Sequence, residues 1–572
     1  MCKLINVLPF LLLCASLSAQ EIIQEGTYGF ESLKKNCYLG DVSVNLEDQT
    51  TSLKYVQNKM GTTTFYTYQF DDNLKFVEEQ QQEYNLDQKV TDIATEVKTA
   101  FSWFTNKYKG ETYTKDRLFV FSKYKGKIGV QKYRYTYAYG WDEGSYYPDA
   151  EKLNGIELKG AKAQKLHLYD WVENSETGEA LLLVGIKGDK DTKVKGQHNR
   201  KFQIVKINSD FEVEYLEKIS FKYNMAVSFM QVLTNELPEE LPAEGFDNNY
   251  PIGDVAQGKL AIVFAPSKNL IGKKSNSSDP SKQALVLINP DGSIDAKIRY
   301  KAPASGWAVE NFLLSADEND LYLYGPAQEE KYFNKLDPDK KWKSFQLMKV
   351  SNKEKVWIKQ TDLKEFKDKI VTPPSQKKSP YYEGKKFART ANFITPDGQI
   401  FIAGQNYSTK KEGEESKQKV IDAYKDLVLF HFDKNGRLKA QYGVRRDKMN
   451  REAKSVQTPQ DLFVSADGQS LYWIYGEIKG YRGGFSLTNF VDANLGMVAK
   501  GKLLYYPAVA KIDLQKGTVG DFVMVGKGKD GKQHYFTHPN FSYVLSPDNA
   551  SLTFVGEDKA GKKIWLGRML LE

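Results

Sequence analysis

One short pattern recurs in the C-terminal half of this 572-residue chain. An apolar strand end is followed by Ser or Thr, then Pro or Ala, then Asp, and then by an apolar and aromatic strand that ends in glycine. The four aspartates lie 80, 70 and 81 residues apart. They are Asp317, Asp397, Asp467 and Asp548. Because Asp favours tight turns and Gly or Asn tolerates positive φ, each copy predicts a β-hairpin.

A second type of hairpin alternates with the first. Its copies begin at Phe65, Phe202, Ala284, Phe345, Leu427 and Ala508. Two hairpins make four antiparallel strands, which is the blade of a β-propeller. Such a sheet cannot bury both faces alone, but sheets packed face to face in a ring can. The sequence therefore predicts an all-β fold, a propeller of about seven blades, with six or eight also compatible.

The repeated hairpin of Ser, Pro or Ala, Asp and Gly before an aromatic strand resembles the WD40-like repeat of TolB-type β-propellers. The resemblance covers the four blades around the aspartates above and fits the N-terminal half poorly. It implies an exported protein that binds other proteins. Some peptidases carry such a ring too, but the propeller and a signal peptide account for nearly all of this chain.

The first twenty residues have the order of a secretory signal peptide. Lys3 supplies a positive charge, Leu4–Leu17 is apolar but short for a membrane span, and Ala19 offers a small residue for cleavage. A large residue precedes Cys14, so the sequence argues against lipid anchoring there. We therefore expect residues 1–20 to be removed, residues 21–572 to form one propeller domain, and the protein to be periplasmic, cell-surface-associated or secreted.

Charge and hydropathy exclude several classes of protein. Lys and Arg number 81 against 73 Asp and Glu, a net charge of +8. This mild, lysine-dominated excess argues against nucleic-acid binding, for which clustered arginine is typical. After the signal peptide, no run of eighteen apolar residues predicts a membrane helix.

One segment departs from the strand pattern. Residues 80–108 contain apolar positions at Val90, Ile93, Val97 and Phe101, a spacing that suits one face of a helix. We expect a short helical decoration packed on the ring.

The connections between the second and third strands of several blades are long, and they lie on one face of a propeller. The longest carries aromatic residues and an arginine around two glycines, and such side chains often anchor interfaces. These candidate partner-binding residues are Tyr481, Arg482, Phe485 and Phe490. The same apolar residues would also suit a plug for the mouth of the ring, so both interpretations stay open.

A second, weaker cluster suggests a ligand site. Carboxylates and phenols occur close together in Asp142, Glu143, Tyr146, Tyr147 and Asp149, a set that suits a sugar or a cation. A tyrosine-rich end of a hairpin explains the same residues without any ligand.

Catalytic motifs are missing from the sequence. It has no H-E-x-x-H, C-x-x-C, G-x-S-x-G or phosphate-binding loop, and it predicts no metal and no cofactor. The main hypothesis is therefore an exported, non-enzymatic propeller that binds a protein of the cell envelope or beyond. The alternative is a carbohydrate-active propeller, either a glycan binder or a hydrolase or lyase that uses axial carboxylates.

Overall fold

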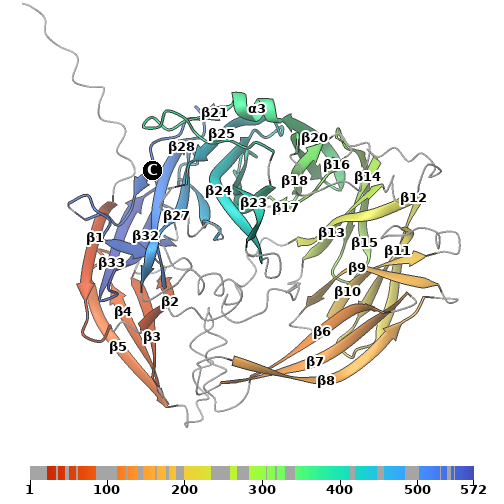
Figure 1. Ribbon diagram of the computed structural model, residues 1–572, viewed down its shortest axis with the longest axis horizontal. Helices are drawn as coiled ribbons and strands as arrows, with labels where there is room; N and C mark the ends of the chain where they lie inside the picture. The colour runs from red at the N-terminus through yellow and green to blue at the C-terminus, as the bar shows by residue number, and fades with distance from the viewer. Residues whose placement is uncertain are drawn as a thin grey trace, which may run out of the picture.

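Strands dominate the computed structural model, as the hairpin repeats predict. The residues that it describes are 22–33, 37–45, 50–59, 62–85, 113–123, 126–139, 146–160, 164–174, 179–187, 199–233, 258–266, 282–304, 306–315, 318–328, 342–384, 386–412, 419–446, 456–482, 502–528, 530–537, 543–546 and 548–571. The chain is an all-β propeller, and Figure 1 shows its sheets following one another around a common axis in chain order.

The first four blades come from the N-terminal half. Blade 1 contains β2 (Cys37–Val44), β3 (Thr51–Lys59), β4 (Thr62–Phe70) and β5 (Phe76–Asn85). Blade 2 contains β6 (Tyr113–Lys123), β7 (Lys127–Tyr139) and β8 (Tyr146–Leu158). Blade 3 contains β9 (Lys165–Asn174), β10 (Glu179–Lys187), β11 (Asn199–Ile207) and the first part of β12 (Val213–Leu233). Blade 4 contains the rest of β12, β13 (Lys259–Pro266), β14 (Lys282–Ile288) and β15 (Ile294–Lys301).

The C-terminal blades follow the repeat more closely. Blade 5 contains β16 (Gly306–Trp307), β17 (Asn311–Leu314), β18 (Asp320–Gln328), β19 (Ser344–Ser351) and β20 (Glu354–Asp362). The short helix α3 (Leu363–Asp368) leads to blade 6, which contains β21 (Ile370–Val371), β22 (Lys386–Ile394), β23 (Ile400–Glu412), β24 (Lys419–Phe432) and β25 (Leu438–Val444). Blade 7 contains β26 (Gln460–Val464), β27 (Ser470–Arg482), β28 (Lys502–Asp513) and β29 (Val523–Met524).

The last blade joins the two ends of the chain. It contains β31 (Tyr543–Leu545), β32 (Ser551–Asp558), β33 (Lys563–Leu570) and the N-terminal strand β1 (Ile22–Gly29). Strand β1 pairs antiparallel with β33, with Gly29 opposite Lys563, so the N-terminal strand completes the last blade. Between blades 7 and 8, β30 (Tyr535–Thr537) pairs with both β28 and β32.

The described strands form six hydrogen-bonded sheets. Because β12 joins blades 3 and 4 and β30 joins blades 7 and 8, these sheets divide into eight blades, one more than the seven expected and within the range of six to eight. The predicted helical segment at 80–108 begins inside β5, because Gln80–Asn85 are strand, and the rest of it lies outside the described residues.

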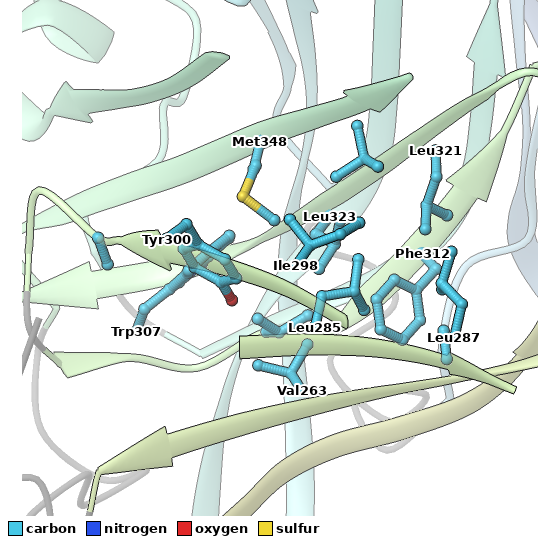
Figure 2. Packing of buried hydrophobic residues seen from close by; sticks show 14 of the residues in the cluster. Val263, Leu285, Leu287, Ile298, Tyr300, Trp307, Phe312, Leu321, Leu323 and Met348 are labelled. Atoms are coloured by element: carbon cyan, nitrogen blue, oxygen red, sulfur yellow. The ribbon is translucent and has the colours of Figure 1, made fainter. Parts of the chain in front are cut away.

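Apolar packing between neighbouring blades supplies the core. In the described residues, seven clusters of buried side chains each join two adjacent blades, and one of them links blade 8 to blade 1. Figure 2 shows the cluster between blades 4 and 5, where the Trp307 ring lies against Tyr300 and Phe312 lies beside Leu285. Buried side chains thus fill seven of the eight seams between neighbouring blades, and in the described residues no such cluster joins blades 1 and 2.

The two ends of the ring differ. At the loop end, second strands stop and third strands begin, and several of these connections are long. They run from Lys187 to Asn199, Pro266 to Lys282, Gln328 to Ser344, Glu412 to Lys419 and Arg482 to Lys502. At the opposite turn end most connections are tight, and the long one between Leu233 and Lys259 is an exception.

The repeated aspartates hold the turns of the turn end. Asp467 accepts a hydrogen bond from Ser465 Oγ at 2.5 Å and another from the Gln469 backbone N–H at 3.0 Å. Asp548 makes the equivalent contact with Ser546 Oγ at 2.6 Å. Gly468 follows in the left-handed region, with φ of 70°. The predicted structural role of these aspartates is confirmed for both residues.

This capping makes a testable prediction. Replacing Asp467 with Ala removes the oxygen that accepts both hydrogen bonds and lowers the free energy of unfolding by about 0.5–1 kcal/mol, measured as a urea midpoint. The hydrogen bond from Ser465 lowers the pKa of Asp467. The stability that it contributes is therefore present above the ordinary pKa and disappears as pH falls through the native pKa. Gln469→Ala is the control, and an equal loss for both variants contradicts the capping role.

Candidate functional site

The predicted partner-binding residues start at the loop end. Tyr481 and Arg482 close β27, where their backbones pair with Leu503 and Lys502 of β28. Phe485 and Phe490 belong to the connection that follows and lie outside the described residues. The topology thus puts the start of this connection on the predicted face.

The second predicted cluster lies at the other end of the ring. The Leu166 backbone N–H, at the start of β9, donates to the Gly126 carbonyl at 2.7 Å, so the β6–β7 turn sits at the loop end. The β7–β8 connection therefore sits at the turn end, where Tyr146 and Tyr147 begin β8 and Asp149 pairs with Thr136. Asp142 and Glu143 fall outside the described residues, and the two predicted sites do not share a face.

A buried polar group that the sequence did not suggest lies at the loop end, between blades 5 and 6. Glu310 directly precedes β17, and its backbone N–H donates to the Tyr324 carbonyl at 2.9 Å. Its side chain keeps partial contact with solvent. Desolvation by the surrounding protein raises the pKa of the carboxyl to about 8, and the positive charge of Arg389 opposes this shift. Such a carboxyl is largely protonated at neutral pH.

Arg389 approaches this carboxyl from the inner strand of blade 6. The pairing of β22 with β23 shifts register between Arg389 and Ala391, which makes Thr390 a bulge. Bulges re-aim neighbouring side chains and are frequent beside functional sites. The Arg389 side chain is exposed, and its backbone carbonyl accepts a hydrogen bond from Gln457 at 3.1 Å.

Tyr382 adds a buried hydroxyl to the same seam. Its backbone N–H donates to Gln441 Oε1 at 2.9 Å, and its side chain is 0% exposed. Burial, with the Glu310 charge as a second cause, raises the pKa of Tyr382 far above its usual range. In the described structure its hydroxyl has no hydrogen-bond partner. A buried donor in this state calls for an explanation.

The raised pKa of Glu310 predicts a pH dependence. Because the native pKa of about 8 exceeds the ordinary 4.5, the native state holds a proton that the unfolded state releases between these values. The stability linked to Glu310 is therefore full below pH 4.5 and is lost as pH rises towards 8. Glu310→Gln, which keeps the neutral state, matches the parent in thermal unfolding at pH 5 and exceeds it at pH 9. An unchanged difference across this range contradicts the assignment.

A buried ion pair occupies the next seam, between blades 6 and 7. Arg446 Nε lies 4.0 Å from Glu477 Oε1, and the two side chains are only 6% and 4% exposed. Burial lowers the pKa of Arg446, and the Glu477 charge opposes that shift. Ionisable side chains therefore lie in two neighbouring seams of the loop end.

Two other ionisable groups, His431 and Asp170, lie apart from these seams or have structural roles. His431 is buried, with its ring nitrogens 3.2 Å from Tyr442 Oη and 2.7 Å from Gln399 Oε1. Burial lowers the pKa of His431 to about 3, so it is neutral, and it serves as a packed residue. On the inner strand β9, desolvation raises the pKa of Asp170, although its side chain is exposed; Asp170 lies in blade 3, two blades from Glu310.

The described ranges lack two further features. They contain no group of three or more His, Cys, Asp or Glu side chains placed to hold a metal ion. Their helices include none long and apolar enough to cross a membrane.

Comparisons with known proteins add little to this geometry. No family model matches the chain, and no curated protein does. One similar solved structure is the Dos1 propeller, with 9% sequence identity and a TM-score of 0.26 over 95% of this chain and 93% of that one. Another is the polysaccharide lyase Uly1, with 9% identity and a TM-score of 0.23 over 93% of this chain and 90% of that one. A mutant of the NanB sialidase from Streptococcus pneumoniae gives 9% identity and a TM-score of 0.25, over 92% of this chain and 84% of that one. At these TM-scores, the assignment of this chain as a β-propeller protein rests on its own strand pairing.

Proposed function

We propose that this chain is an exported, TolB-like propeller that binds a protein partner through its loop end and is not an enzyme. The contrast between the two ends carries the proposal. At the turn end, side chains such as Asp467 are used to hold their own turns. The strands at the loop end lead into the long connections, and the seams at this end contain Glu310, Arg389 and the pair Arg446–Glu477. Variable connections on a rigid scaffold are where binding residues concentrate.

The position of β1 supports the export part of the proposal. This strand starts at Ile22, two residues after the predicted signal peptide. Removal of residues 1–20 would therefore leave the strand that pairs with β33 whole.

Replacement of one connection tests the binding face. Residues 483–501 are exchanged for a Gly/Ser linker of equal length, and the mature protein is used to capture partners from its native envelope and culture fluid. The proposal expects a partner that the parent captures to be lost. The matched control exchanges residues 234–257 at the turn end and keeps that partner. If both variants capture the same set as the parent, the loop end is not the binding face.

A carbohydrate-active propeller is the second candidate, because Glu310 and Asp170 are carboxyls of raised pKa on or beside inner strands. A general acid of a glycoside hydrolase needs such a pKa. A glycan array and a hydrolysis screen test it, and activity that Glu310→Gln abolishes would favour it over the first proposal.

A further inference from the structure

The outer strand of blade 8 has a free edge. Strand β1 is the last strand of its sheet, and within the described residues it pairs on one side only, with β33. Figure 1 shows it at the outside of the ring. Its side chains alternate between partly buried and exposed, and Ile23 is 56% exposed. The free edge therefore offers backbone hydrogen-bond groups next to an exposed apolar side chain.

Other outer strands have features that protect an edge. Those of blades 1 to 5 carry three or four charged residues each, and β21 pairs with the edge of β25 in blade 6. Strand β29 of blade 7 has only two residues. Charge, covering and shortness all prevent unwanted strand pairing. Strand β1 has eight residues and a single charge, Glu25, so it is the open edge best suited to accept another strand.

A cavity lies beside this edge. It has a volume of about 280 Å³, and β1 lines it with residues 22–25. The end of blade 7 contributes Met524 and the following Lys527, and β33 contributes Trp565. Trp565 Nε1 donates to Glu25 Oε2 at 3.3 Å, which holds the carboxylate at the cavity. Because successive side chains of a strand point to opposite faces, a strand added to β1 would direct alternate side chains towards this space.

The cavity carries charges of both signs. Glu25 and Lys527 are exposed, and neither makes an ion pair with any residue that the structure describes. A strand with a basic residue for Glu25 and an acidic residue for Lys527 would complement both. Full-length antiparallel pairing of β1 with β1 of a second copy would instead bring two Glu25 carboxylates to neighbouring positions, which disfavours a dimer of this chain.

We propose that β1 is a second interaction surface, to which another protein adds an extended strand with an apolar residue for the cavity and charged residues for Glu25 and Lys527. In this mode of recognition, backbone hydrogen bonds supply affinity and alternate side chains supply specificity. The surface lies at the rim of the ring and is separate from the loop end, so this inference does not rest on the proposed function.

A pair of peptides tests strand addition. Ac-TVKVEV-NH2 and its proline analogue Ac-TVKPEV-NH2 are titrated against the mature protein at pH 7 by ligand-observed NMR. The first is expected to bind with a Kd on the order of 1 mM. Proline removes a backbone N–H and restricts φ, so the analogue binds at least about tenfold more weakly. Hydrogen exchange followed by mass spectrometry is expected to show slower exchange in residues 22–29 when the first peptide is present.

Ile23→Lys tests the edge itself. A charge on the free edge and the loss of the apolar side chain weaken binding of Ac-TVKVEV-NH2 by about tenfold or more. Because Ile23 is exposed, the thermal midpoint stays unchanged. Val356→Lys is the matched control, since Val356 is 53% exposed on the outer strand β20 of blade 5, and it changes nothing. Unchanged binding by Ile23→Lys overturns the surface.

Glu25→Gln tests the charge. This variant keeps an acceptor for Trp565 Nε1 and removes the negative charge. Binding of Ac-TVKVEV-NH2 weakens about threefold, whereas binding of the uncharged Ac-TVQVQV-NH2 does not change. Equal effects on the two peptides contradict the role of Glu25 as the partner of a basic residue.

The outcomes distinguish this surface from the loop end. Equal binding of the proline analogue, or unchanged exchange in residues 22–29, overturns strand addition even if replacement of 483–501 abolishes partner capture. A concentration-dependent dimer of the parent that Ile23→Lys converts to monomer assigns the edge to a second copy and overturns a different partner. Peptide binding that depends on Ile23, with partner capture unaffected by the replacement, keeps the rim surface and removes the proposal for the loop end.

Discussion

Deletion of β1 is expected to prevent the mature chain from forming a stable monomer. Residues 22–29 supply the outer strand of blade 8, and their loss exposes the edge of β33. An exposed strand edge promotes pairing with other chains. The deletion also removes Tyr28, whose hydroxyl donates to the Leu74 carbonyl at 2.5 Å. This hydrogen bond links blade 8 to blade 1.

Size-exclusion chromatography and circular dichroism measure this effect. The variant that lacks residues 1–29 elutes as aggregate or shows an early thermal transition, and the control that lacks only residues 1–20 elutes as a folded monomer. A synthetic peptide of residues 22–29 added during refolding restores part of the monomer. A monomer of unchanged thermal midpoint after deletion of β1 contradicts the closing role of this strand.

The second large effect concerns the buried pair between blades 6 and 7. Arg446→Met removes the guanidinium that faces the Glu477 carboxylate and leaves that carboxylate buried, which lowers the free energy of unfolding by about 3–5 kcal/mol. The double variant Arg446→Met with Glu477→Met removes both charges, and most of the stability returns because apolar side chains replace a desolvated pair.

Urea unfolding of the parent, the two single variants and the double variant measures this coupling as a double-mutant cycle. Losses that simply add in the double variant would show that the two side chains do not interact. Such a result would leave the seam without its proposed ionic contact.

Local chemistry explains what the sequence predicted well. Asp467 and Asp548 determine turns through contacts with residues two positions away, so the pattern shows in a single hairpin. The pairing of β1 with β33 covers the otherwise free edge of the last strand in the chain. The blade number was harder, because the period came from C-terminal blades with long connections. Blade 1 has only a short connection, from Lys59 to Thr62, so it uses fewer residues than the C-terminal blades. The chain is therefore long enough for eight blades.

The candidate site was hidden for a different reason. Glu310 and Arg389 lie on different blades, and no spacing rule connects them along the sequence. The one local signal is a charged residue beside an apolar inner strand, in the sequences AVENFLL and ARTANFI, and it does not show which charges meet. Blade 3 and blade 4 also share the continuous strand β12, a departure that no repeat pattern indicates.

A cystine between β1 and β33 tests the closed ring most directly. Gly29 and Lys563 lie opposite each other, and a Cβ at Gly29 would lie 3.9 Å from the Lys563 side chain without a clash. We predict that the variant Gly29→Cys with Lys563→Cys forms a disulfide between β1 and β33 under native conditions. A mobility shift on a non-reducing gel, reversed by a reductant, would show this bond. The pair Gly29→Cys with Lys562→Cys, one residue out of register, stays reduced. Equal cross-linking of the two pairs, or none in either, would contradict closure of the propeller by its N-terminal strand.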